Sequence, residues 1–127
     1  MFGEEKFFGK SEHIIDDKTR LSLPTSTKRE TGEKILIIKD NDLDIFKLYN
    51  VEEISKLFDK INEKILNAKT KEEAIINKKK ILELSEKIIR SSKVDTLGRI
   101  VLGKNFKGTE KVELIGANNH LILRIKK

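Results

Sequence analysis

The order of apolar and polar residues predicts strands at both ends of the chain and helices in its middle. Near the start, leucines alternate with a polar residue over residues 21–23, as in a half-buried strand. Residues 35–38 are continuously apolar, which is typical of a buried strand, and residues 44–49 follow an Asn-Asp turn as its hairpin partner. Further strands are predicted at residues 11–16, 100–102, 112–115 and 121–125.

The middle of the chain predicts two helices, over residues 51–67 and 70–90, arranged as an antiparallel hairpin. Each starts at a polar cap followed three residues later by a glutamate, which is the arrangement of a capping box. The first helix carries apolar side chains on one face, and the second repeats them every seven positions. The caps are Asn50 with Glu53 and Thr70 with Glu73, and the apolar positions are Ile54, Leu57, Phe58, Ile61 and Ile65, then Ile75, Leu82 and Ile89.

The predicted strands form two copies of one pattern. Each copy has an aspartate, a tight polar turn, an arginine four residues after the aspartate and then an apolar run, at residues 16–24 and 95–102. Arg99 lies 79 residues after Arg20. Two unrelated hairpins with ordinary turn residues would explain either copy alone, but blocks repeated in the same order predict a duplication. Two further pairs of blocks, residues 32–38 with 109–115 and 41–48 with 118–125, continue the repeat.

A chain of 127 residues is long enough for one domain with a modest core. We therefore expect a single domain made of a first repeat (residues 1–50), a helical hairpin (51–90) and a second repeat (91–127). The absence of cysteine excludes disulfides, thiolate metal sites and thiol catalysis, and it fits a reducing compartment. No apolar run approaches the ~20 residues needed to cross a bilayer, and the start is unlike a signal peptide. We expect a soluble, cytoplasmic protein without membrane contact.

The charge of the chain is concentrated in its last part. The formal net charge is +6, and residues 91–127 hold eight basic and three acidic side chains, so they account for +5 of it. A basic surplus suits a polyanion such as DNA, because neutralising phosphates releases their counterions. The alternative is a protein that is merely soluble and rich in lysine, and charge alone does not separate the two.

Residues typical of an active site are absent from the sequence. The only histidines, His13 and His120, lie at unmatched positions of the two repeats, so we expect no shared metal site. There is no nucleophile elbow and no glycine-rich phosphate loop. The carboxylates of Asp16, Asp17 and Asp95 are in principle able to catalyse hydrolysis, but turn capping is the favoured role, because aspartates bond backbone amides two residues on. We expect neither an enzyme nor a cofactor.

The ordered motifs resemble those of the MraZ family, bacterial transcriptional regulators built from two AbrB-like repeats. The resemblance covers nearly the whole chain. Thr19 stands where the family usually has a glycine, Gly103 where it usually has a proline, and the usual helix after the second repeat is missing. The matching residues are His13, Asp16, Asp17, Lys18, Arg20, Leu21 and Pro24, then Tyr49, Glu52 and Glu53, then Asp95, Gly98 and Arg99, then Ile115, Gly116 and Asn119.

The resemblance implies both a fold and a function. The fold is α+β: two AbrB-like repeats, each with two strands, a short helix and a hairpin, swap hairpins to close a β-barrel, and a two-helix insert projects between them. The function is sequence-specific binding of double-stranded promoter DNA at repeated boxes upstream of division and cell-wall genes. The family acts as a ring-like homo-oligomer on the nucleoid, and the apolar lead Phe2, Phe7 and Phe8 is a candidate contact between subunits. The alternative is that these rings fill the end of the protein's own barrel.

The candidate DNA-binding residues are Lys18, Arg20, Arg99, Lys28 and Arg29. The family's Lys-x-Arg matches Lys18 and Arg20, and Arg99 occupies the equivalent turn. An arginine just after a β-turn projects outward, and its fork can bond a guanine edge or bridge phosphates, while Lys18 suits a phosphate. The alternative function is a scaffold or antitoxin-like module whose helix pair grips another protein without binding DNA.

Overall fold

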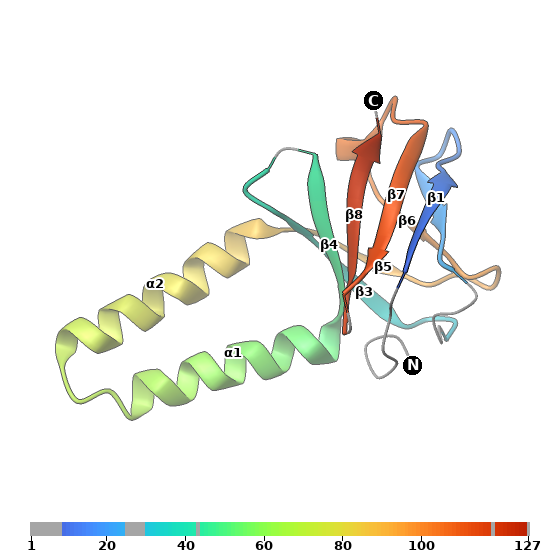
Figure 1. Ribbon diagram of the computed structural model, residues 1–127. Coiled ribbons are helices and arrows are strands. Elements are labelled where there is room, and N and C mark those ends of the chain that lie inside the picture. Colours follow the sequence, from blue (N-terminus) through green and yellow to red (C-terminus); the bar gives the residue numbers. More distant parts are fainter. Residues whose placement is uncertain (1–8, 25–29, 43, 118, 127) are drawn as a thin grey trace.

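The computed structural model describes residues 9–24, 30–42, 44–117 and 119–126 of the chain, and these form an α+β fold (Figure 1). Strands occupy both ends of the chain and two α-helices lie between them, as the hydrophobic pattern predicts. The elements are β1 (Lys10–Ile14), β2 (Arg20–Ser22), β3 (Lys34–Lys39), β4 (Ile45–Asn50), α1 (Val51–Leu66), α2 (Lys71–Lys87), β5 (Ile88–Lys93), β6 (Arg99–Val101), the 3-10 turn η1 (Lys104–Phe106), β7 (Lys111–Gly116) and β8 (Leu121–Lys126).

The strands of the two repeats interleave. They form a six-stranded sheet in the order β1-β7-β8-β4-β3-β5 and a separate two-stranded ribbon, β2-β6. The order is symmetric: if the strands β1–β4 and β5–β8 exchange names, the same order is read from the opposite edge of the sheet. The first strand of each half therefore pairs with the third strand of the other half, β1 with β7 and β5 with β3. Strands β4 and β8 pair at the centre of the sheet, and all the pairings are antiparallel. The topology therefore has the two-fold symmetry expected of a duplicated chain.

The expectation of a closed β-barrel is wrong. The six-stranded sheet has two edges, β1 and β5, and the β2-β6 ribbon does not join them into a continuous ladder. Both ribbon strands are only three residues long, and they pair with each other. Pro24 and Gly103 follow them closely, and neither residue favours continuation of a strand. The architecture is an open sheet that a short ribbon covers.

The hydrophobic core lies between the sheet and the ribbon, and both repeats supply it. In the ribbon, Leu21 faces Ile100, and both side chains are buried. The ring of Phe46 from β4 meets that of Phe106 from η1 at a centroid distance of 4.6 Å. Neither half could close this core alone. Its members are Ile15, Leu21, Leu23, Ile35, Ile37, Phe46, Leu48, Val94, Ile100, Leu102, Phe106, Val112, Leu114, Leu121 and Leu123.

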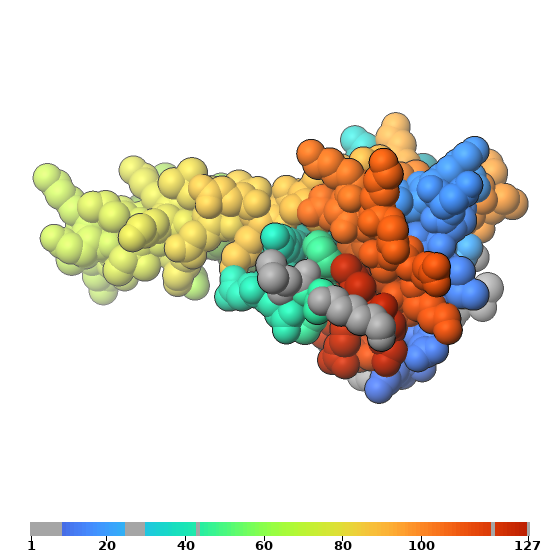
Figure 2. Space-filling model, turned by 90° about the horizontal axis from the view of Figure 1, so that it is seen from above, coloured from blue at the N-terminus to red at the C-terminus, as the bar shows by residue number. Residues whose placement is uncertain are grey.

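The two helices form an arm that projects from the strands, as Figures 1 and 2 show. Both predicted caps are confirmed: Asn50 Oδ1 accepts a 2.8 Å hydrogen bond from Glu53 N, and Thr70 Oγ1 accepts one of 3.1 Å from Glu73 N. The second helix ends at Lys87 rather than near residue 90, because the next residues pair with β3 as strand β5. Several aliphatic side chains of the arm remain exposed: Leu57, Leu66, Ile75, Ile76 and Leu82.

Candidate nucleic-acid interface

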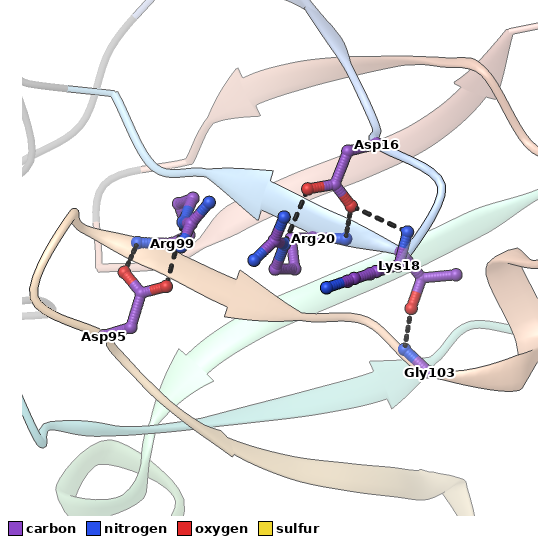
Figure 3. A network of polar contacts seen from close by, with 7 residues as sticks. Asp16, Lys18, Arg20, Asp95, Arg99 and Gly103 are labelled. Atoms are coloured by element: carbon purple, nitrogen blue, oxygen red, sulfur yellow. Dashed lines mark hydrogen bonds and ion pairs between the residues drawn. The ribbon is translucent and has the colours of Figure 1, made fainter.

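The first turn is organised by the carboxylate of Asp16. Its Oδ1 accepts hydrogen bonds from the backbone N–H groups of Lys18 at 3.0 Å and Arg20 at 2.8 Å. Its Oδ2 accepts a third bond from Arg20 Nε at 2.6 Å. One carboxylate thus shapes the turn and also holds the guanidinium of the arginine that leaves it (Figure 3).

The second turn repeats this arrangement around Asp95. Its Oδ1 accepts from the backbone N–H groups of Leu97 at 2.9 Å and Arg99 at 2.8 Å, and its Oδ2 accepts from Arg99 Nε at 2.9 Å. The residue before each arginine has a left-handed backbone, with φ of 57° at Thr19 and 75° at Gly98. Glycine adopts this conformation at little cost, whereas a β-branched threonine does so only where its surroundings hold it. The two turns therefore share the same hydrogen bonds and the same left-handed residue before the arginine.

Backbone hydrogen bonds join the two turns to each other. Leu102 N donates to Thr19 O at 2.8 Å, and in the symmetric bond Leu23 N donates to Gly98 O at 3.0 Å. A further bond breaks the symmetry, because Gly103 N donates to Thr19 Oγ1 at 3.2 Å. The symmetric counterpart cannot exist, since Gly98 has no hydroxyl group and Pro24 has no N–H. Thr19 thereby gains a partner that helps to hold its left-handed backbone.

Both arginines lie on one face of the ribbon. Arg20 pairs with Val101 and Arg99 pairs with Ser22, so the two arginines are diagonal neighbours across the strands. Side chains alternate between the faces of a strand, and Leu21 between them points into the core. The arginine face is consequently the outer face, and diagonal positions on such a pair lie roughly 7–8 Å apart. Figure 3 shows the two side chains over the ribbon.

Each guanidinium is held at one nitrogen and open at the others. The side chains of Arg20 and Arg99 are 29% and 26% exposed. Among the described residues, each guanidinium donates through Nε, and its two Nη groups have no hydrogen-bond acceptor there. Each arginine also forms an ion pair with the aspartate of its own turn. The same side chain thus pairs with an aspartate through Nε and keeps its two Nη groups available for another partner.

Both aspartates are stabilised in their charged form. Hydrogen bonding from the backbone N–H of Arg20 lowers the pKa of the Asp16 carboxyl, and the Arg20 side chain and Lys18 N–H add to this against an opposing effect of desolvation. The pKa of Asp95 is lowered in the same way by the backbone and side chain of Arg99 and by Leu97 N–H. Asp16 and Asp95 are therefore ionised at neutral pH. We call each aspartate together with the arginine that it holds a clamp.

The other predicted residues divide into two groups. Lys18 is exposed at the tip of the first turn, beside Arg20. Lys28 and Arg29 lie outside the described residues.

The basic side chains at the end of the chain are only partly available: Arg124 Nη1 and Lys126 Nζ lie 3.3 and 3.6 Å from the carboxylate of Glu113, which is 2% exposed. Part of the positive surplus of residues 91–127 is thus matched inside the protein.

Glu113 keeps its negative charge in spite of its burial. Desolvation raises the pKa of its carboxyl, but the ammonium of Lys10 at 3.4 Å and the charges of Lys126 and Arg124 together lower that pKa below its usual value. This cluster lies on strands β1, β7 and β8 and holds neighbouring strands together. Its role is structural, and its cations are less suited to bind a polyanion.

Arg90 is a third arginine beside the ribbon, and sequence reasoning missed it. Its Nε donates to Ser92 Oγ at 3.0 Å and to the carbonyl oxygen of Val101 in β6 at 3.1 Å. Gly103 leaves room for it, because a Cβ at residue 103 would lie 3.1 Å from Arg90 Cδ. The repeat carries no signal for this residue, since Ser11 occupies the corresponding position in the first copy.

Neither histidine belongs to the ribbon strands, since His13 lies in β1 and His120 directly precedes β8. His120 stacks on Tyr49 at a centroid distance of 4.4 Å, and its Nδ1 lies 3.0 Å from Asn119 Oδ1. Burial and the charge of Lys47 lower the pKa of His120. Among the described residues there is no group of three or more His, Cys, Asp or Glu side chains that could hold a metal ion.

Neither helix in the described part of the chain is long and apolar enough to cross a membrane. No family model and no curated protein matches the chain. The geometry of the two turns is accordingly the main guide to function.

Proposed function

We propose that this protein is a sequence-specific, MraZ-like transcriptional regulator that binds promoter DNA through the outer face of the β2-β6 ribbon. The observation that carries the proposal is the pair of arginines, Arg20 and Arg99, on one face of a two-stranded antiparallel ribbon. The major groove of B-DNA is about 12 Å wide and admits a two-stranded β-ribbon. A ribbon with two outward arginines has the size and chemistry to read base edges there.

The aspartates fit a role in preparing the arginines for this contact. Asp16 and Asp95 engage Nε of their arginines, while guanine presents two acceptors, O6 and N7, to a bidentate arginine. The two Nη groups can supply both donors without breaking the bond at Nε. Because each guanidinium is already oriented, less side-chain entropy is lost on binding. A scaffold without a ligand at this face has no need of two such clamps.

Further basic residues would add contacts to the DNA backbone. Lys18 stands next to the Arg20 turn, where its ammonium suits a phosphate. Arg90 lies beside β6 and would extend the positive surface. Lys28 and Arg29 belong to the same proposal by resemblance. Such contacts set orientation and affinity, while sequence is read by the arginines.

The wider MraZ-like features belong to this proposal too. We include in it that the two repeats are AbrB-like and exchange hairpins within one chain; the interleaved order of the strands supports this, although the sheet stays open. The protein would act in the cytoplasm on the nucleoid, at repeated boxes near division and cell-wall genes, as a ring-like homo-oligomer. Exposed Ile75 and Leu82 on the arm offer an apolar contact between subunits, while Phe2, Phe7 and Phe8 lie outside the described residues.

The second candidate function is a protein-interaction scaffold or antitoxin-like module. The same exposed aliphatic side chains of the arm favour it, because an apolar helix face can seat a partner protein. This candidate does not account for the two aspartate-arginine clamps. We therefore place it second.

DNA titration with matched variants tests the proposal. Duplexes selected from a random pool by the wild-type protein, together with the DNA upstream of its own gene, would be titrated with Arg20→Ala, Arg99→Ala and Lys60→Ala. Each arginine variant should lose about 1–3 kcal/mol of binding free energy per lost bidentate contact. Lys60 is exposed on α1, so its variant removes one positive charge away from the ribbon and should bind almost as the wild type does.

Two results would contradict the proposal. One is a wild-type protein that selects no sequence from the pool. The other is wild-type affinity in a folded double variant of Arg20 and Arg99. Circular dichroism on every variant shows that a loss of binding is not a loss of fold.

A further inference from the structure

The two turns that carry the arginines have the same backbone and opposite chemistry at their tips. Lys18 and Leu97 occupy equivalent positions, since the backbone N–H of each donates to Oδ1 of its own turn's aspartate at 3.0 and 2.9 Å. Both precede their arginine by two residues. One tip therefore presents an ammonium group, and the other presents an isobutyl group.

Leu97 is 66% exposed, and core packing does not explain its presence. Single exposed leucines are common on protein surfaces. This one differs in place, because the other large aliphatic side chains exposed in the described ranges lie on the helices or at the end of β1. Leu97 instead lies at the tip of the turn that delivers Arg99. Its neighbours in that turn, Asp95 and Thr96, are polar.

We propose that Leu97 contacts the C5-methyl group of a thymine while Lys18 contacts a phosphate, so that the ribbon binds its DNA site in one direction. This inference rests on the proposed DNA binding through Arg20 and Arg99. In the major groove the thymine methyl is the apolar group that distinguishes base pairs, and small apolar side chains recognise it. Lysine contacts phosphates and carries no such preference.

The spacing along the chain limits where that thymine lies. Leu97 and Arg99 are two residues apart, and two residues span at most about 7 Å. Successive bases of one strand are separated by about 3.4 Å along the helix axis. The thymine is therefore expected within about two base pairs of the base that Arg99 reads. At the other end of the ribbon, Lys18 imposes no methyl preference.

The consequence is a site with a direction. A ribbon with the same residue at both tips would bind a symmetric site equally well in either orientation, because its two strands and its two arginines are related by the pseudo-two-fold axis. Leu97 and Lys18 break that equivalence. Only one orientation places the leucine on the methyl group.

Uracil substitution tests the contact directly. In the duplex that the wild-type protein selects, each thymine near the centre is replaced in turn by deoxyuridine, which removes the methyl group and nothing else. One position should weaken binding about fourfold, the effect of losing one buried methyl group. Leu97→Ala should weaken binding to the thymine duplex similarly and be insensitive to the uracil, since the two changes remove one shared contact.

Salt dependence separates the two tips. Binding weakens as salt rises, so the slope of log affinity against log salt is negative. Lys18→Ala should make this slope less steep by about one and leave the uracil effect intact. Leu97→Ala should leave that slope unchanged. In the double exchange Lys18→Leu with Leu97→Lys, the methyl-sensitive position should move to the opposite side of the site.

Failure of the inference would differ visibly from failure of DNA binding itself. If no uracil substitution changes the affinity, or if Leu97→Ala weakens thymine and uracil duplexes equally, Leu97 makes no methyl contact, while binding that depends on Arg20 and Arg99 still stands. If the wild-type protein selects no duplex, both proposals fall. Leu97 is an exposed turn residue, so its variants are expected to fold.

Discussion

The side-chain oxygen of Thr19 accepts a hydrogen bond of 3.2 Å from the backbone N–H of Gly103, which lies 84 residues further along the chain. These are two of the places at which the sequence departs from the MraZ-like pattern, which usually has a glycine and a proline there. A proline at residue 103 has no N–H to donate, and a glycine at residue 19 has no oxygen to accept. The two departures are therefore complementary, and together they link one repeat to the other.

Removal of this hydrogen bond should destabilise the protein without changing its shape. Thr19→Val keeps the branched side chain and loses only the acceptor, so the free energy of unfolding should fall by about 0.5–1.5 kcal/mol. Thr96 is exposed in the second turn, and Thr96→Val is the matched control, with an expected change within about 0.5 kcal/mol. Urea denaturation of both variants measures the difference. Equal stability of the two would show that the bond contributes nothing.

Asp16 should increase the sequence specificity of DNA binding, although its negative charge repels DNA. Asp16→Asn removes one negative charge near the phosphates, so electrostatics alone predicts tighter binding to every sequence. Loss of the charged partner of Arg20 Nε frees the guanidinium, so affinity for the selected site should fall. The ratio of specific to non-specific affinity should therefore drop several-fold. An unchanged ratio, measured by competition with random duplex DNA, would mean that the clamp does not orient the arginine.

Acid should weaken the fold through the two clamps. The pKa values of Asp16 and Asp95 are lowered in the folded protein, chiefly by hydrogen bonds from the backbone N–H groups of Arg20 and Arg99. A lowered pKa means that the unfolded chain takes up protons first, so this contribution is complete above the unfolded value of ~3.9. It is lost as pH falls from there through the lower folded value.

Denaturation midpoints between neutral pH and strong acid measure this effect. The Asp16→Asn/Asp95→Asn double variant lacks both titrating groups, so its midpoint should fall less steeply in acid than that of the wild type. The carboxyl of Glu113, whose pKa is also lowered, remains and accounts for a residual slope. Parallel curves for the two proteins would rule out a contribution from the clamps.

Local rules predicted both helices and every strand except β5, while the way the strands assemble depends on contacts between distant parts of the chain. The caps at Asn50 and Thr70 form as expected because each bond is made within one helical turn. The end of α2 was placed too late, because Ile88 and Ile89 continue the helical spacing in the sequence but belong to β5, which pairs with β3. A closed barrel would need the three-residue strands β2 and β6 to pair with the edges of the sheet. No local sequence pattern specifies such pairing, and the two strands pair with each other instead.

In the candidate site, too, the sequence predicted the local parts but not the contacts between distant parts of the chain. The repeat located both aspartate-arginine turns, because each is built within five residues of sequence. That the arginines share one face follows from the pairing of β2 with β6, strands about 80 residues apart, and needed the structure. Arg90 could not be anticipated, since it has no counterpart in the first repeat and reaches the ribbon from strand β5.

The last prediction concerns the arm. Ile75 and Leu82 are each 61% exposed and lie seven residues apart on α2, so they share one face of the helix. If this face joins subunits, Ile75→Glu/Leu82→Glu should convert the oligomer to a monomer, because it buries charges in an apolar contact. Light scattering gives the mass. Ser55→Glu/Asn62→Glu, with the same charge and spacing at exposed positions of α1, is the control and should keep the wild-type mass.

The same pair of variants tests how assembly supports DNA binding. Several ribbons on one oligomer act on repeated boxes with a high effective concentration, so dissociation should weaken binding to DNA with several boxes far more than to DNA with one. The monomeric variant should therefore keep its affinity for a single box, since the arm meets the sheet away from β2 and β6. A wild-type protein that is itself monomeric at micromolar concentration would exclude the oligomer, and an oligomer that persists in Ile75→Glu/Leu82→Glu would place the subunit contact elsewhere.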